Sequence, residues 1–71
     1  INLTTVKFER DQDADQTIAT ANRTIFLNQE SIEYFYEEEW KPNCVLNVIY
    51  TTSGELITVF ESQQEIMEML K

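Results

Sequence analysis

The sequence predicts an α+β fold: a small antiparallel sheet of four to five strands, built from hairpins or a meander, with one C-terminal α-helix packed on it. Three observations support this prediction. Stretches rich in β-branched and aromatic residues recur along the chain, as is typical of strands. The one glycine and the one proline both fall between such stretches. Over residues 62–71 the apolar spacing changes from alternation to the period of a helix.

The length of 71 residues predicts a single domain that spans residues 1–71. A chain of this size buries only about 60% of its unfolded surface, so its margin of stability is small. Small proteins often add disulfides, a metal or a partner subunit. Cys44 is the one cysteine and the chain has no histidine, which excludes an intrachain disulfide and leaves a Cys/His zinc site short of ligands. Self-association as a homodimer is therefore the remaining source of stability.

In the first half of the chain, polar stretches separate the predicted strands. The first strand needs an irregularity near Thr4–Thr5, because its apolar residues change face there. Residues 9–17, "ERDQDADQT", have no apolar rhythm and predict a loop. In the predicted turn at 28–31, Asn28 and Ser31 can bond to their own backbone. The five predicted strands cover residues 1–8, 18–28, 31–40, 44–52 and 56–60.

The second half of the chain predicts a central strand between two turns. Pro42 lacks a backbone donor and places a turn at 40–43, and Gly54 permits the positive φ of a hairpin turn at 52–55. Both faces of residues 44–52 are largely apolar, which indicates a strand covered on both sides.

The last ten residues predict a helix that must pack on the sheet. Ser62 and Glu65 have the spacing of a capping box. Ile66, Met69 and Leu70 recur at helical intervals. A helix this short is not stable alone in water, so we expect these three side chains to be core residues.

The charge of the chain restricts its partners. Thirteen acidic residues oppose five basic ones, for a net charge of −8. Nucleic acid and anionic membranes are bound by Lys and Arg, so neither is expected as a direct partner. A protein partner with a basic surface is electrostatically favoured. No apolar run reaches the length of a membrane span, and the first residues do not resemble a signal peptide, so we expect a cytoplasmic protein.

The residue types of the chain do not predict an enzyme. Without histidine there is no Ser-His or Cys-His arrangement, and with one glycine there is no glycine-rich phosphate loop. Glu37, Glu38 and Glu39 are the obvious carboxylates for acid–base chemistry, but such chemistry needs a pocket that a chain of this size has little volume to form. Cys44 is expected to be a small buried apolar residue. We expect no catalytic residue and no cofactor.

Acidic residues at alternate positions suggest a calcium loop, but the pattern is incomplete. Asp11, Asp13 and Asp15 match the first three ligand positions of an EF-hand. The glycine required at the sixth position is Gln16, and the glutamate required at the twelfth is Asn22. We therefore expect a solvated acidic loop and no metal site.

The stretch "YFYEEEW", residues 34–40, is the candidate interaction site. On a regular strand, Ile32, Tyr34 and Tyr36 share one face, opposite Phe35. In one interpretation Ile32, Tyr34 and Tyr36 pack under the helix, and the glutamates face water and discourage edge-to-edge aggregation. In the other, aromatic anchors are exposed among carboxylates and bind a partner that presents Arg or Lys. The candidate partner-binding residues are Phe35, Tyr36, Glu37, Glu38, Glu39 and Trp40.

Three segments resemble the FlbD-like proteins, small bacterial chains associated with flagellar operons. They are "FLNQESIEYF" (26–35), "VIYTTSGELITVFES" (48–62) and "QEIMEML" (64–70), and the resemblance extends over about two-thirds of the chain. The family pattern has a short turn into a strand, a hairpin with a glycine turn and a final helix. It implies a small, non-enzymatic protein with no catalytic residue to transfer. Residues 9–22 and the glutamate run depart from the pattern.

Two functional hypotheses follow. The first is a small acidic regulatory module of bacterial or phage type that binds a basic protein surface and self-associates. The alternative is a phage-type acidic inhibitor that mimics nucleic acid and blocks a DNA- or RNA-binding enzyme. Mimicry requires carboxylates spaced like phosphates along one ridge, drawn from Asp11, Asp13, Asp15 and Glu37–Glu39.

Overall fold

The structure, a computed structural model, describes residues 1–13 and 16–71. It contains five strands, one 3₁₀ turn (η1) and one short α-helix. In chain order these elements are β1 (Asn2–Asp11), β2 (Gln16–Phe26), η1 (Gln29–Ser31), β3 (Ile32–Lys41), β4 (Cys44–Thr51), β5 (Leu56–Val59) and α1 (Gln63–Met69).

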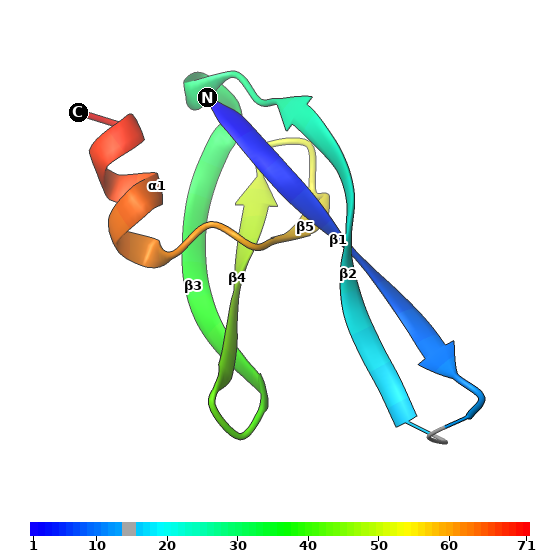
Figure 1. Cartoon of the computed structure of the whole chain (residues 1–71). Helices are drawn as coiled ribbons and strands as arrows, with labels where there is room; N and C mark the ends of the chain where they lie inside the picture. The colour runs from blue at the N-terminus through cyan, green and yellow to red at the C-terminus, as the bar shows by residue number, and fades with distance from the viewer. Residues whose placement is uncertain (14–15) are drawn as a thin grey trace.

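The strands form one antiparallel sheet in the order β2-β1-β5-β4-β3. β3, β4 and β5 make a meander, and the β1–β2 hairpin joins it through a single paired position, Thr5 opposite Val59. β5 is much shorter than its neighbours, so the β1–β2 and β3–β4 hairpins extend beyond it as two arms (Figure 1). The predicted antiparallel sheet with a C-terminal helix is confirmed, with five strands and a fold that is nearly all-β.

The core lies where α1 meets β1, β4 and β5. Leu3, Ile49, Val59 and Ile66 are completely buried there. The side chains packed around them are partly buried: Ile1, Ile25, Leu27, Ile32, Phe35, Ile57, Met69 and Leu70. The prediction that the helix docks through its apolar stripe is therefore confirmed.

Hydrogen bonds hold both ends of α1. The Ser62 side chain accepts from the Glu65 backbone N–H at 3.1 Å, and the Ser62 N–H donates to the Glu65 carboxylate at 3.3 Å, which forms the predicted capping box. At the other end, the Gln29 side chain in η1 donates to the Leu70 carbonyl at 3.2 Å. These contacts fix the helix over the sheet although it has only seven residues.

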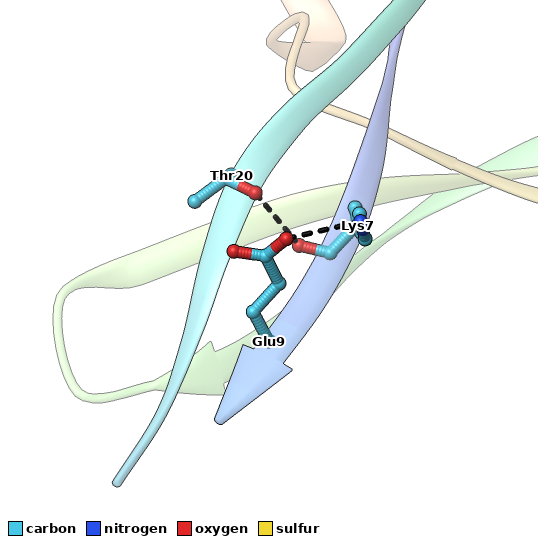
Figure 2. Close-up of polar contacts among 3 residues, drawn as sticks. All are labelled: Lys7, Glu9 and Thr20. Carbon is cyan, nitrogen blue, oxygen red and sulfur yellow. Dashed lines mark hydrogen bonds and ion pairs between the residues drawn. The ribbon is translucent and has the colours of Figure 1, made fainter. Parts of the chain in front are cut away.

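The predicted loop at residues 9–17 is too long: Gln12 and Asp13 form a turn, residues 9–11 and 16–17 belong to strands, and residues 14–15 lie outside the described residues. β1 continues to Asp11 and β2 begins at Gln16, and the ladder between them runs without a break from Val6 onward. Lys7 forms an ion pair with Glu9 at 3.0 Å, and the Thr20 hydroxyl donates to the Lys7 carbonyl at 3.4 Å (Figure 2). Hydrophobic periodicity does not reveal this part of the hairpin, because most of its side chains face water and polar residues occupy both faces.

The predicted irregularity near Thr4–Thr5 is present in the β1–β2 ladder. The register shifts between Thr4 and Val6, where two residues of β2, Asn22 and Arg23, lie opposite Thr5. The surplus residue therefore belongs to β2. A carboxylate from the β5–α1 connection, Glu61, accepts from the Thr4 N–H at 2.7 Å and so ties this irregular segment to the core.

β4 is the central strand that the sequence predicts. Leu46 and Val48 are buried on one face, and Ile49 is buried on the other. Asn47 is also buried, and its amide donates to the Glu61 carbonyl at 3.0 Å. The two predicted turns are confirmed as well, since Asn43 at φ 66° and Gly54 at φ 90° supply positive φ values at the ends of β4.

Within the described residues, no helix is long and apolar enough to cross a membrane.

Candidate functional site

The predicted site lies on β3, an edge strand of the sheet. Its ladder with β4 is regular from Tyr34 to Glu39, with a shift on each side of that stretch. At each shift β3 has one residue more than β4, so Glu33 and Trp40 are bulged. Six regular residues between two bulges are the part of this edge that resembles an ideal strand.

The first bulge changes which side chains face the core. Because Glu33 is an extra residue, Ile32 lies on the same side as Phe35, and both pack against the core beneath α1. Tyr34 and Tyr36 point to the other side and are 50% and 41% exposed. The expectation that Tyr34 and Tyr36 pack under the helix is therefore wrong, whereas Ile32 does so as expected.

The predicted site residues are consequently divided between the two faces of β3. Phe35 is partly buried on the helix side, and Glu37 and Glu39 follow it on that side towards the β3–β4 turn. Tyr36 and Glu38 lie on the opposite face. The structure therefore does not bring all six predicted residues to one surface.

The three glutamates are exposed and carry uncompensated charge. Among the described residues, no ion pair involves Glu37, Glu38 or Glu39. No lysine or arginine occurs between Arg23 and Lys41 in the sequence. The three carboxylates on consecutive residues therefore concentrate negative charge near the end of the β3–β4 arm.

Trp40 has a structural contact within the chain. Its ring lies 5.2 Å from the ring of Phe8 on β1, measured between centroids, and the Lys41 ammonium lies 4.5 Å from the Trp40 centroid. Lys41 also donates to the Thr17 carbonyl on β2. Through these contacts Trp40 and Lys41 link the β3–β4 arm to the β1–β2 arm.

A tyrosine cluster, not anticipated from the sequence, occupies the face opposite the helix, with Tyr34 and Tyr36 exposed and Tyr50 partly buried. The rings of Tyr34 and Tyr50, directly paired on β3 and β4, stack with centroids 4.9 Å apart. The Tyr36 ring lies 6.2 Å from that of Tyr34. Leu56 on β5 pairs with Tyr50 and is 63% exposed. We call the surface formed by Tyr34, Tyr36 and Tyr50 the tyrosine face.

Alternation places the fifth residue of the regular stretch, Glu38, on the same side as the tyrosines. The tyrosine face therefore has a carboxylate beside it on the same strand. The sequence signal for this arrangement was the alternation of Tyr34, Tyr36 and Glu38, but the bulge that exposes them is not evident from residue types.

The described residues form no pocket. They also contain no group of three Cys, His, Asp or Glu side chains placed to hold a metal ion. Of the carboxylates with calcium-like spacing, Asp11 accepts from the Asp13 N–H at 3.1 Å, and Asp15 lies outside the described residues. Cys44, expected to be buried, is only partly buried, and it is a free thiol.

Comparison with known proteins adds no relative. No family model matches the chain, and no curated protein or solved structure matches it. The resemblance of residues 26–70 to the FlbD-like proteins therefore stays a prediction.

Proposed function

We propose that the protein is a small, non-enzymatic, cytoplasmic interaction module that binds a basic protein surface through the glutamates of β3. The observation that carries the proposal is the exposure of Glu37, Glu38 and Glu39 on an edge strand, without an ion pair among the described residues. A partner with Lys or Arg at matching positions gains attraction at little cost, because these carboxylates give up no ion pair with the described part of the chain.

The glutamates also have a purely protective explanation. Charged side chains on an edge strand prevent the sheets of two copies from joining. That explanation predicts that replacing the glutamates promotes self-association and reduces partner capture no more than replacing exposed carboxylates elsewhere on the chain. A binding role instead predicts that the position of the carboxylates matters, and this difference determines the choice of control.

The test is capture of proteins from the cells that produce this chain, using the immobilised protein and mass spectrometry. The test variant carries Glu37→Gln, Glu38→Gln and Glu39→Gln together. The matched control carries Gln at three exposed glutamates elsewhere, Glu30, Glu55 and Glu68, so that both variants lose the same charge. Unchanged circular dichroism spectra are required of both.

We expect a basic protein that wild type and the control variant capture at low salt and that the test variant captures several-fold less. Capture should weaken steeply as the salt concentration rises, because exposed charges are screened beyond about 8 Å at physiological ionic strength. Equal capture by both variants would reduce the glutamates to a solubility feature. If the captured protein is a nucleic-acid-binding enzyme released by added DNA or RNA, the mimicry hypothesis takes precedence.

A further inference from the structure

We infer that β3 accepts an arginine-bearing extended segment of another protein as a sixth strand, with alternate arginines placed over the tyrosine face. This inference rests on the proposed function and names the chemistry of the partner. It combines two features that the glutamates alone do not explain: an edge strand with a regular stretch, and a stacked tyrosine cluster on one side of that stretch.

The edge supplies the backbone positions. Among the described residues, β3 has a neighbouring strand, β4, on one side only. About half of its backbone hydrogen-bonding groups over the regular stretch, Tyr34–Glu39, therefore have no partner in a described strand. An extended segment adds to such an edge by main-chain hydrogen bonds, and pockets or surfaces for its alternate side chains provide specificity. Six residues between two bulges match a short segment of about the same length.

The side chains of β3 then determine which residue types the added segment needs at its alternate positions. An added strand lies about 4.8 Å from β3, and its alternate side chains recur about every 7 Å on each face. On the tyrosine face they meet Tyr34, Tyr36 and Glu38 in turn. The two tyrosines expose half or nearly half of their surface, and Glu38 is exposed beside them.

Arginine fits these three positions better than any other residue. Its planar guanidinium stacks on aromatic rings and also forms paired hydrogen bonds with a carboxylate. Lysine provides the same charge but cannot stack as a plane or bind a carboxylate in the two-pronged manner. The row formed by Tyr34, Tyr36 and Glu38 therefore favours arginine over lysine, whereas the net charge of the protein does not distinguish between them.

A second copy of this chain is a poor occupant of the same edge. Pairing β3 with β3 would bring the exposed glutamates of both copies to one interface, between molecules that each carry a net charge of −8. Like charges placed opposite each other on neighbouring strands are destabilising. The negative charge of the exposed glutamates on β3 therefore disfavours pairing with a second copy and also attracts a basic strand.

The experiment uses three capped heptapeptides and NMR titration of the isotopically labelled full chain. The test peptide is TRTRTRT, which places its arginines on one face of a strand. TKTKTKT keeps the charge and the spacing but replaces arginine with lysine. TTRRRTT keeps the composition of the test peptide but distributes its arginines over both faces.

We expect TRTRTRT to shift the backbone amides of residues 34–39 and the ring signals of the tyrosine face, and to protect outward amides of β3 from hydrogen exchange. TKTKTKT and TTRRRTT should bind at least about fivefold more weakly. The Tyr36→Thr variant, which keeps a strand-forming residue, should bind TRTRTRT more weakly by a similar factor. The affinity of Tyr36→Phe should be unchanged. Phe26→Thr, which removes a 76% exposed aromatic ring from the opposite edge, should bind like wild type.

Equal affinity for all three peptides, or unchanged binding by Tyr36→Thr, would overturn strand addition. Protection of the β3 amides before any peptide is added, together with a doubled mass in solution, would instead make a second copy the occupant and also overturn it. These failures leave the proposed function intact if the glutamate variant still loses its basic partner. Conversely, strand addition without any effect of the glutamates on capture would refute only the proposed function.

Discussion

The docking of α1 can be tested most sharply at Ile66. This side chain is completely buried against Leu3, Ile49 and Val59, which belong to three different strands. Ile66→Ala removes most of the buried side chain, and changes of this kind cost about 2–5 kcal/mol through lost burial and the cavity left behind. A 71-residue domain has a total stability of about 4–11 kcal/mol, so the loss is a large fraction of the whole.

The neighbouring residue provides the matched control. Met67 is the next residue of the same helix and is 56% exposed. Met67→Ala should change the free energy of unfolding by no more than about 0.5 kcal/mol, because an exposed position is altered and alanine is an excellent helix former. We therefore expect Ile66→Ala to lower the melting temperature by roughly 8–40 °C and Met67→Ala to leave it nearly unchanged.

Urea unfolding followed by two probes shows whether the helix and the sheet form one cooperative unit. Circular dichroism reports the sheet, and the fluorescence of Trp40 reports the contact between the two hairpin arms. Both transitions should coincide in wild type and in Ile66→Ala, since the core joins α1 to both hairpins. Equal losses of unfolding free energy in Ile66→Ala and Met67→Ala would refute the docking of α1 on the sheet. A Trp40 transition that stays at the wild-type midpoint would refute the cooperativity.

Three further predictions concern single contacts. Ser62→Ala removes the side-chain half of the capping box with Glu65 and should cost about 1 kcal/mol in urea unfolding; a neutral result would mean that the cap does not contribute to stability. Gly54→Ala should cost about 1–2 kcal/mol from backbone strain alone, because φ is 90° and a Cβ there meets nothing closer than 4.0 Å; a stabilised variant in the same assay would contradict that φ. Phe8→Ala removes the ring that contacts Trp40 and should shift the fluorescence of Trp40 to longer wavelength; unchanged emission would show that the arms are not bridged by these rings.

Local sequence patterns were sufficient to predict most elements of the fold. The capping residues Ser62 and Glu65, the helical spacing of Ile66, and the turn at Gly54 each involve residues a few positions apart. Their physics is short-range, since hydrogen bonds and backbone angles within one turn favour one conformation regardless of what packs around it. The apolar character of both faces of β4 likewise indicated its central place in the sheet.

The first hairpin shows where such patterns fail. Residues 9–11 and 16–17 continue β1 and β2, although their side chains have no apolar alternation. Their strand conformation comes from pairing with each other, which a search for hydrophobic periodicity does not detect. The signal that remained in the missed part was one β-branched residue, Thr17, which lies opposite Arg10 on β1.

The amino-acid sequence by itself thus determined the fold class, the capped helix, the turns and the negative charge of β3. Only the tertiary structure decided which aromatic rings of that strand face water. The bulge at Glu33 turns Ile32 and Phe35 to the core and leaves Tyr34 and Tyr36 outside, and the Trp40 ring contacts Phe8 on a strand that is distant in the sequence. The physical reason is that a bulge depends on the register with the neighbouring strand, and one surplus residue exchanges the faces of all side chains beyond it.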